Sequence, residues 1–238
     1  MEALVINLDG QSYTRLRDSI EDTNSRVYLK RFRATTPETL DEDLKEFPWF
    51  KWTWPLAGQM EGLDLKTGVY KFVYQAENQQ KKIACSVSHM RAWKEVIKYG
   101  RPMYIFESDA VITRTMQPHH MHTADGKPLA EILGLNDPRG ATRRSQQFHQ
   151  IVSQDNSSTI AKPIPTVNYH GEHPYPQGLA GNSAYYITPK GAKALLEKAK
   201  DIGMWTNDAF MCKEVFPWLR TAYPYFTKVS GERSTTVT

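Results

Sequence analysis

The sequence predicts an α/β fold in one domain of 238 residues. Three features support this prediction: a short apolar run near the N-terminus, strand and helix patterns that alternate after it, and an amphipathic helix late in the chain. Hydrophobic residues make up 40% of the chain and charged residues 24%, which is typical of an ordinary globular protein and not of a disordered one. The length is enough for one large domain.

The first half of the chain contains patterns typical of strand, strand, helix and strand. Residues 3–8 form an apolar run that ends at a turn signal, and residues 26–34 alternate well enough for a second strand. Residues 83–99 carry a broad apolar face at helical spacing, and Gly100 is a typical helix end. A further strand is expected to begin at Met103.

The second half contains the clearest helix signal. Residues 183–188 are typical of a strand, and the helix after it has Thr188 as a good N-cap and Pro189 at its first position. A short helix is expected to begin after Asn207 or Asp208.

Residues 114–180 show poor periodicity, so a loop-rich middle is expected there. They hold six of the seven histidines, namely His119, His120, His122, His149, His170 and His173. Their spacing matches no zinc pattern and no cysteine lies near them, so solvated loop histidines are expected.

Charge and cysteine usage narrow the class of protein. A net charge of +4 suits an anionic substrate such as a nucleotide, although a slight lysine excess explains it equally well, and it is too small to indicate nucleic-acid binding. Cys85 and Cys212 make no disulfide framework, which favours a reducing compartment. The start of the chain lacks the pattern of a signal peptide, and no run has the length of a membrane span. A cytoplasmic protein is therefore expected.

Two acids stand in a stretch that otherwise favours a buried strand, YIFESDAVIT at residues 104–113. In a continuous strand Glu107 and Asp109 point to the same side and Ser108 to the other. Two such carboxylates would repel each other unless a cation lay between them, and oxygen ligands suit Mg²⁺ or Mn²⁺. The alternative is that the strand ends here and that the acids are solvated or cap a turn.

Taken in order, five segments resemble glycosyltransferase family 25, a family of lipopolysaccharide-type glycosyltransferases with members in large DNA viruses. These segments are VINLD (5–9), ACSVSHMRAW (84–93), YIFESDAV (104–111), NSAYYITPKGAKALL (182–196) and TND (206–208).

The resemblance implies a GT-A fold, a single domain over residues 1–238 built of two abutting Rossmann-like halves. The nucleotide-sugar half would cover about 1–113 and the acceptor half about 114–238. The implied activity is transfer of a hexose from a UDP-sugar to a hydroxyl of a glycan or glycoprotein acceptor, with Mn²⁺ or Mg²⁺. Such a protein, if encoded by a virus, would act in the host cytoplasm. Two alternatives stay open: a nucleotide-sugar or phosphodiester hydrolase, and a carbohydrate-binding protein without catalysis.

The resemblance also assigns a donor-binding acidic motif. Asp109 would be the metal ligand, with Glu107 helping through water or by holding the ribose. The family usually has an aspartate where this chain has Ser108.

The end of the first strand would hold the base, through Asn7 and the backbone of Leu8, because α/β proteins form ligand crevices there. Arg15 or Arg17, in the turn after it, would meet the diphosphate. A solvated helix face explains these two arginines equally well.

Ser88 and His89 match a Ser-His pair of the family. His89 would either donate a hydrogen bond to the leaving group or be a core histidine. Asp208, near a helix N-terminus that lowers its pKa, would be the general base of an inverting reaction or would hold sugar hydroxyls in a retaining one.

Two other clusters have less specific meaning. The aromatic run FPWFKWTWP at 47–55 is expected to pack beneath an insertion, although it could also stack on sugars or bases. The basic cluster Arg139, Arg143 and Arg144 could attract phosphate or form a solvated loop.

Overall fold

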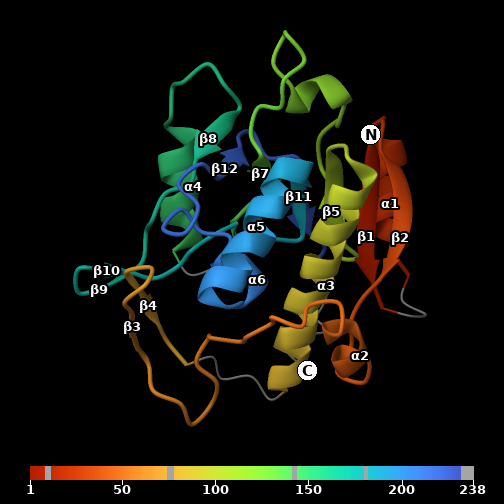
Figure 1. Ribbon diagram of the computed structural model, residues 1–238. Helices are drawn as coiled ribbons and strands as arrows, with labels where there is room; N and C mark the ends of the chain where they lie inside the picture. The colour runs from red at the N-terminus through yellow and green to blue at the C-terminus, as the bar shows by residue number, and fades with distance from the viewer. Residues whose placement is uncertain (9–11, 74–77, 141–143, 180–181, 232–238) are drawn as a thin grey trace.

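The protein is built around one mixed seven-stranded sheet, seen in a computed structural model that describes residues 1–8, 12–73, 78–140, 144–179 and 182–231 (Figure 1). From edge to edge the strands are β2 (Tyr28–Arg33), β1 (Glu2–Asn7), β5 (Met103–Glu107), β11 (Ala184–Ile187), β7 (Ile132–Gly134), β12 (Arg220–Ala222) and β8 (Ala161–Pro163).

Most strands of this sheet point the same way. β2, β1 and β5 are parallel to one another, and so are β7 and β12. β11 runs antiparallel between β5 and β7, and β8 runs antiparallel at the far edge. The α/β prediction is confirmed, and strands from both halves of the chain form one sheet.

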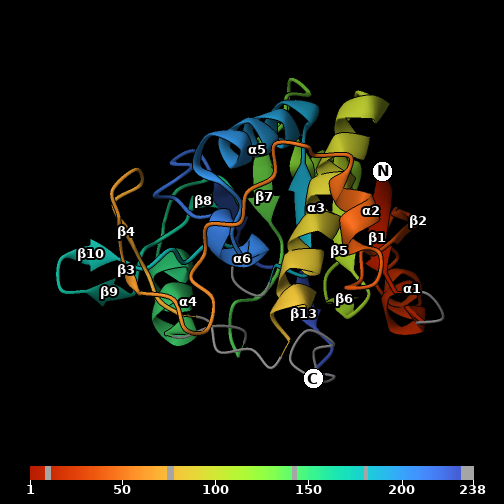
Figure 2. The same ribbon diagram turned by 60° about the horizontal axis from the view of Figure 1, so that its bottom comes forward.

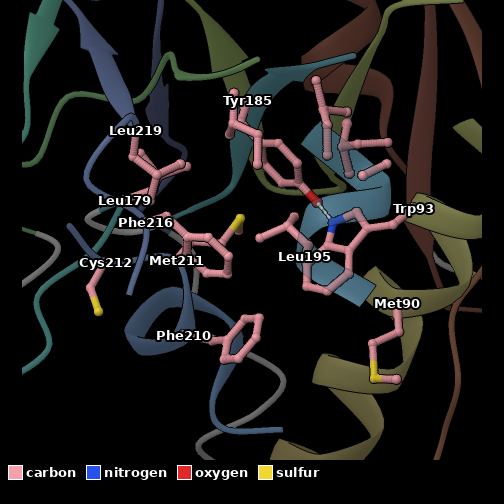
Figure 3. Close-up of a cluster of buried hydrophobic side chains, with 14 of the residues drawn as sticks. Met90, Trp93, Leu179, Tyr185, Leu195, Phe210, Met211, Cys212, Phe216 and Leu219 are labelled. Carbon is pink, nitrogen blue, oxygen red and sulfur yellow. Dashed lines mark hydrogen bonds between the residues drawn. The ribbon is translucent and has the colours of Figure 1, made fainter. Parts of the chain in front are cut away.

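The two faces of the sheet bury two separate cores because neighbouring residues of a strand point to opposite sides. Leu4 and Ile6 of β1 face a core covered by α3 (Gln79–Tyr99), α5 (Pro189–Ile202) and α6 (Asn207–Phe210). Ala3 and Val5 face the other core, which α1 (Thr14–Asp22) helps to cover. Figure 3 shows the first core, where side chains of α3, α5 and β11 meet those from the C-terminal part of the chain.

The remaining elements lie outside this sheet. They are α2 (Leu40–Leu44), β3 (Gly62–Asp64), β4 (Val69–Lys71), β6 (Ala110–Ile112), the 3₁₀ helix η1 (Pro118–Met121), α4 (Ser145–Ser153), β9 (Tyr169–His170), β10 (His173–Pro174) and β13 (Thr227–Val229). Among the described residues, no helix has both the length and the apolar character needed to cross a bilayer.

Capping residues mark the ends of the two long helices, α3 and α5. Thr188 caps α5 by accepting a hydrogen bond from the Gly191 amide at 3.0 Å, as predicted. α3 ends at Gly100, whose φ of 65° is the left-handed conformation that favours glycine. α3 begins at Gln79, four residues before the predicted start, because Asn78 caps it through the Lys81 amide.

The aromatic run at 47–55 packs against the body of the protein. Trp54 is 2% exposed and lies 5.6 Å from the ring of Trp205 and 5.7 Å from that of Phe72. Trp52 forms a bridge with Met204, and Lys71 lies over the Trp205 ring. These contacts agree with the packing interpretation.

The middle of the chain is more ordered than its periodicity predicts. It holds α4, whose Phe148 and Val152 are buried, and two strands of the main sheet. Two buried positions one turn apart are too few for a clear periodic signal. Figure 2 shows the hairpins β3–β4 and β9–β10 beside each other, and Tyr70 stacks on His170 there at 4.1 Å.

Candidate active site

A cavity of about 400 Å³ opens at the carboxyl ends of the parallel strands β1, β2 and β5. This edge is where open α/β sheets bind ligands, because loops and helix ends converge there. Its walls are Ile6 and Leu8, the segment 34–38 after β2, the α3 residues Lys81, Ala84, Cys85 and Ser88, and Glu107 with Ser108 after β5.

The acidic stretch does not form one continuous strand, so that prediction is wrong. β5 ends at Glu107, where the Glu107 amide bonds the carbonyl of Ser183 at 2.7 Å. Ser108 and Asp109 form a turn, and β6 then leaves the main sheet to pair with β13. The chain must turn because β5 and β6 belong to different sheets. Strand alternation therefore does not relate Glu107 to Asp109.

Glu107 is held from behind by a buried histidine. His89 is 0% exposed, and its Nε2 lies 3.1 Å from Oε1 of Glu107, whose side chain is 33% exposed. The other ring nitrogen of His89 lies 2.9 Å from the hydroxyl of Tyr185. His89 is thus buried, as the core alternative expected, but its two ring nitrogens contact side chains where that alternative expected backbone.

Ser88 uses its hydroxyl to join two parts of the wall. Its Oγ accepts a hydrogen bond of 2.8 Å from the Thr35 amide and donates one of 2.9 Å to the carbonyl of Ala84. The hydroxyl thus holds the segment after β2 against α3.

A buried carboxylate fixes the same segment from the other side. Asp43 is 4% exposed and accepts hydrogen bonds from Arg33, Thr35, Thr39 and Arg91 at 2.5, 2.7, 3.2 and 3.2 Å. Burial alone would raise the pKa of this carboxyl, but the bonds from Thr35 and Arg33 and the arginine charges hold it below its ordinary value. Asp43 is therefore an ionised centre that orders the cavity wall.

Asp208 lies in the first turn of α6, which spans only four residues. Asp208 is exposed, and one of its carboxylate oxygens accepts a 3.0 Å hydrogen bond from the Ala209 amide. Desolvation by the surrounding protein raises the pKa of this carboxyl, and the charge of Glu107 adds to the rise, against the opposing charge of Lys82. The expectation of a lowered pKa is wrong, because desolvation outweighs the few amides of so short a helix.

Cys85 lies among these acids. Burial raises the pKa of its thiol well above the ordinary value, and the charges of Glu107, Asp208 and Asp109 raise it further. The electrostatic influence of all three acids on one thiol indicates that they belong to one region. Cys85, His89 and Glu107 also offer ligand atoms within 4.8 Å of one another, the geometry of a possible metal cluster.

Of the eight predicted donor-binding residues, four line the cavity, and Asn7, Arg15, His89 and Asp109 are not among its lining residues. Leu8, Ser88, Glu107 and Ser108 line the cavity. Asn7 is buried at the end of β1, with its carbonyl accepting a hydrogen bond from the Ala34 amide, and the carbonyl of Leu8 accepts one from Arg31.

The predicted arginines are not part of the cavity wall. Arg15 and Arg17 are exposed on α1, and Arg17 pairs with Asp18 at 3.5 Å. The turn residues 9–11 lie outside the described residues.

The basic cluster of the middle segment has structural partners. Arg139 pairs with Asp137, and Arg144 donates a hydrogen bond to the carbonyl of Val167 at 2.9 Å. Arg143 lies outside the described residues.

Two parts of the site escaped the sequence reasoning. The segment 35–38 carries no pattern of its own and becomes a wall only because β2 lies beside β1. Lys81 and Lys82 stand in the first turn of α3, where a cation opposes the helix dipole. Two lysines at an unfavourable helix position were a signal that could have been used.

The sequence matches the model of a family described as glycosyltransferase family 25 (LPS biosynthesis protein) over residues 1–211. No curated protein sequence matches the chain. Among solved structures, the chain is similar to the galactosyltransferase LgtC in complex with donor and acceptor sugar analogs, at 9% identity and a TM-score of 0.44. That similarity covers 93% of this chain and 73% of the other.

Proposed function

The chain belongs to glycosyltransferase family 25, and we propose that it transfers a hexose from a UDP-sugar to a hydroxyl group of a glycan or glycoprotein acceptor. The observation that carries the proposal is the cavity at the ends of β1, β2 and β5, whose lining combines apolar residues with Lys81 and Glu107. A nucleoside diphosphate needs both an apolar wall for its base and cations for its phosphates.

The apolar part of the cavity suits the nucleoside. Ile6, Leu8, Ala34 and Pro37 line it next to the ends of β1 and β2. Because Ser88 and Asp43 hold the segment after β2 in place, this wall is formed before any ligand arrives.

The cationic part suits the diphosphate. Lys81 lines the cavity in the first turn of α3, and the charge of Lys82 acts on Asp208. Negative charge develops on the departing diphosphate during transfer, so fixed cations beside it lower the barrier.

The acids fit a hard divalent cation. Asp109 and Glu107 offer carboxylate oxygens, and Oε1 of Glu107 is the oxygen that His89 bonds. Burial raises the pKa of the neighbouring Cys85 thiol, which disfavours the thiolate, so carboxylate oxygens are the proposed donor set. Mn²⁺ or Mg²⁺, when bound by Asp109 with help from Glu107, would supply positive charge to the diphosphate.

Asp208 is the proposed general base. It is accessible to an acceptor, and its raised pKa brings it closer to the pH at which a base both stays ionised and binds a proton well. It would take the proton from the acceptor hydroxyl as that oxygen attacks the sugar carbon. In a retaining reaction the same residue would hold sugar hydroxyls.

We propose that the chain is one domain in which residues 1–113, approximately, bind the nucleotide-sugar and residues 114–238, approximately, bind the acceptor. We further propose a cytoplasmic location, supported by the two free thiols Cys85 and Cys212.

Incubation with a panel of UDP-sugars, Mn²⁺ and glycan acceptors tests the proposal. Transfer to an acceptor supports it. Release of free sugar without transfer would indicate a hydrolase, and failure to bind any nucleotide would indicate a carbohydrate-binding protein.

A further inference from the structure

Four side chains form a continuous chain from the core to the candidate site. The indole Nε1 of Trp93 lies 2.8 Å from the hydroxyl oxygen of Tyr185, a contact shown in Figure 3. That oxygen lies 2.9 Å from Nδ1 of His89, and Nε2 of His89 lies 3.1 Å from Oε1 of Glu107. Trp93, Tyr185 and His89 are all 0% exposed.

Trp93, the first of the four side chains, determines which atom donates in each of these hydrogen bonds. An indole nitrogen can only donate, so the Tyr185 oxygen accepts from Trp93. The tyrosine proton then has one acceptor among the described residues, the Nδ1 of His89. A neutral imidazole that accepts at Nδ1 carries its proton on Nε2, and this proton lies toward the carboxylate of Glu107.

The other neutral tautomer of His89 leaves two groups without a hydrogen-bond partner. If His89 carried its proton on Nδ1, both it and Trp93 would donate to the Tyr185 oxygen. The buried tyrosine proton would then have no acceptor, and the Nε2 lone pair would face a carboxylate oxygen. An unsatisfied buried donor is costly, so the first direction prevails.

We propose that Trp93 and Tyr185 hold His89 as the Nε2–H tautomer, and that His89 in this form is a positioning residue for Glu107. His89 fixes Oε1 of Glu107 from behind. It leaves Oε2, which bonds no group among the described residues, as the oxygen that meets the ligand.

The same tautomer makes metal binding by the cluster of Cys85, His89 and Glu107 less favourable. A proton on Nε2 occupies the lone pair that a metal would need. Zinc binding there would require this proton to leave Nε2, so we expect a cation at Glu107 to be bound by oxygen ligands.

The tautomer is measured on the free protein, without donor or turnover. Long-range ¹H–¹⁵N correlation spectra of uniformly ¹⁵N-labelled protein near neutral pH report which ring nitrogen is protonated, and His89→Gln identifies the His89 signals. We expect protonation at Nε2 alone, unchanged when Zn²⁺ is added. Protonation at Nδ1, in either condition, would overturn the inference.

The positioning role is tested with a pair of tyrosine variants. Tyr185→Phe removes the hydroxyl that directs His89. Tyr104→Phe is the matched control, because Tyr104 is 1% exposed on the neighbouring strand β5 and its hydroxyl bonds no group among the described residues. Thermal melts establish that both variants fold.

We expect Tyr185→Phe to give a mixture of His89 tautomers and about tenfold weaker binding of UDP with Mn²⁺, the lower range for groups that orient a metal-site residue. Tyr104→Phe should change neither. A single Nε2–H tautomer with unchanged affinity in Tyr185→Phe would overturn the role. This role rests on the proposed function: if the wild-type protein binds no UDP, that function fails while the tautomer measurement stands by itself.

Discussion

The backbone amide of Thr35 donates a 2.8 Å hydrogen bond to Oγ of Ser88, which joins the segment after β2 to the middle of α3. The two residues are far apart in sequence, and they meet because β2 and α3 flank the same end of β1. One side chain thus connects the two walls of the cavity.

Ser88→Ala should therefore loosen the cavity wall. We expect a loss of about 1 kcal/mol in the free energy of unfolding, since a buried amide loses its acceptor, together with weaker UDP binding. Ser86→Ala is the control, because Ser86 is equally buried in α3 but donates to the Lys82 carbonyl of its own helix. Urea unfolding and calorimetric titration provide the measurements. Equal effects of the two variants would show that the Thr35 bond contributes nothing.

Because of Asp43, the free energy of unfolding should fall at acid pH. Its pKa in the folded state lies below the ordinary value of about 3.9, so its ionised form contributes stability above that pH. That contribution is lost as the pH falls through the lower, folded-state pKa. Asp43→Asn should lower the free energy of unfolding at neutral pH by about 3 kcal/mol, because it leaves Arg33 and Arg91 without their buried partner.

Urea unfolding over a pH series checks this prediction. In Asp43→Asn the decline of stability below about pH 4 should be shallower than in the wild type. Glu46→Gln is the control, since Glu46 also pairs with Arg91 but its side chain is 36% exposed, so its loss should be within about 1 kcal/mol. A decline of wild-type slope in Asp43→Asn would contradict the assignment.

Asp208→Asn should separate chemistry from binding. We expect UDP and metal affinity near that of the wild type, with turnover reduced at least about a hundredfold, the lower range for loss of a general base. Asp201→Asn, which changes an exposed acid at the end of α5, should leave turnover unchanged. Near-normal turnover in Asp208→Asn would show that Asp208 is a carboxylate at a helix end and not the general base.

The pH dependence of turnover gives Asp208 an independent test. The base form is the carboxylate, so activity is lost as the pH falls through its pKa. Because desolvation raises this pKa, the acidic limb of kcat should lie at higher pH than for an ordinary aspartate. A raised carboxyl pKa also means that the folded state binds the proton more tightly than the unfolded state, so ionised Asp208 lowers stability at neutral pH. The Tm of Asp208→Asn should accordingly not fall.

Asp109→Ala should remove metal-dependent nucleotide binding while the protein stays folded. We expect the affinity for UDP in the presence of Mn²⁺ to fall by at least about a hundredfold, the upper range for loss of a group that supports a metal site. The bond from the Ser230 amide goes to the Asp109 carbonyl, so the turn keeps this contact in the variant. Asp125→Ala, at an exposed turn acid paired with Lys127, is the control. Unchanged affinity in folded Asp109→Ala would exclude Asp109 as a ligand.

Local patterns in the sequence were enough to predict much of the scaffold. The strands β1, β2, β5 and β11, and the helices α3 and α5, appear where apolar spacing and capping residues place them. Such elements depend on residues within a turn or two of one another, so their signals are local. The order of the quoted segments was also enough to identify the family.

Tertiary structure decided the site. The turn at Ser108 and Asp109 follows from β5 and β6 joining different sheets, which strand propensity cannot express. The wall at 35–38 exists because β2 lies beside β1. Asp208 has a raised pKa because segments distant in the chain partly desolvate its carboxylate, an effect larger than that of its own short helix. The sequence by itself determined the elements and the family, whereas the meeting of segments far apart in the chain determined the cavity, its electrostatics and the buried contacts of His89.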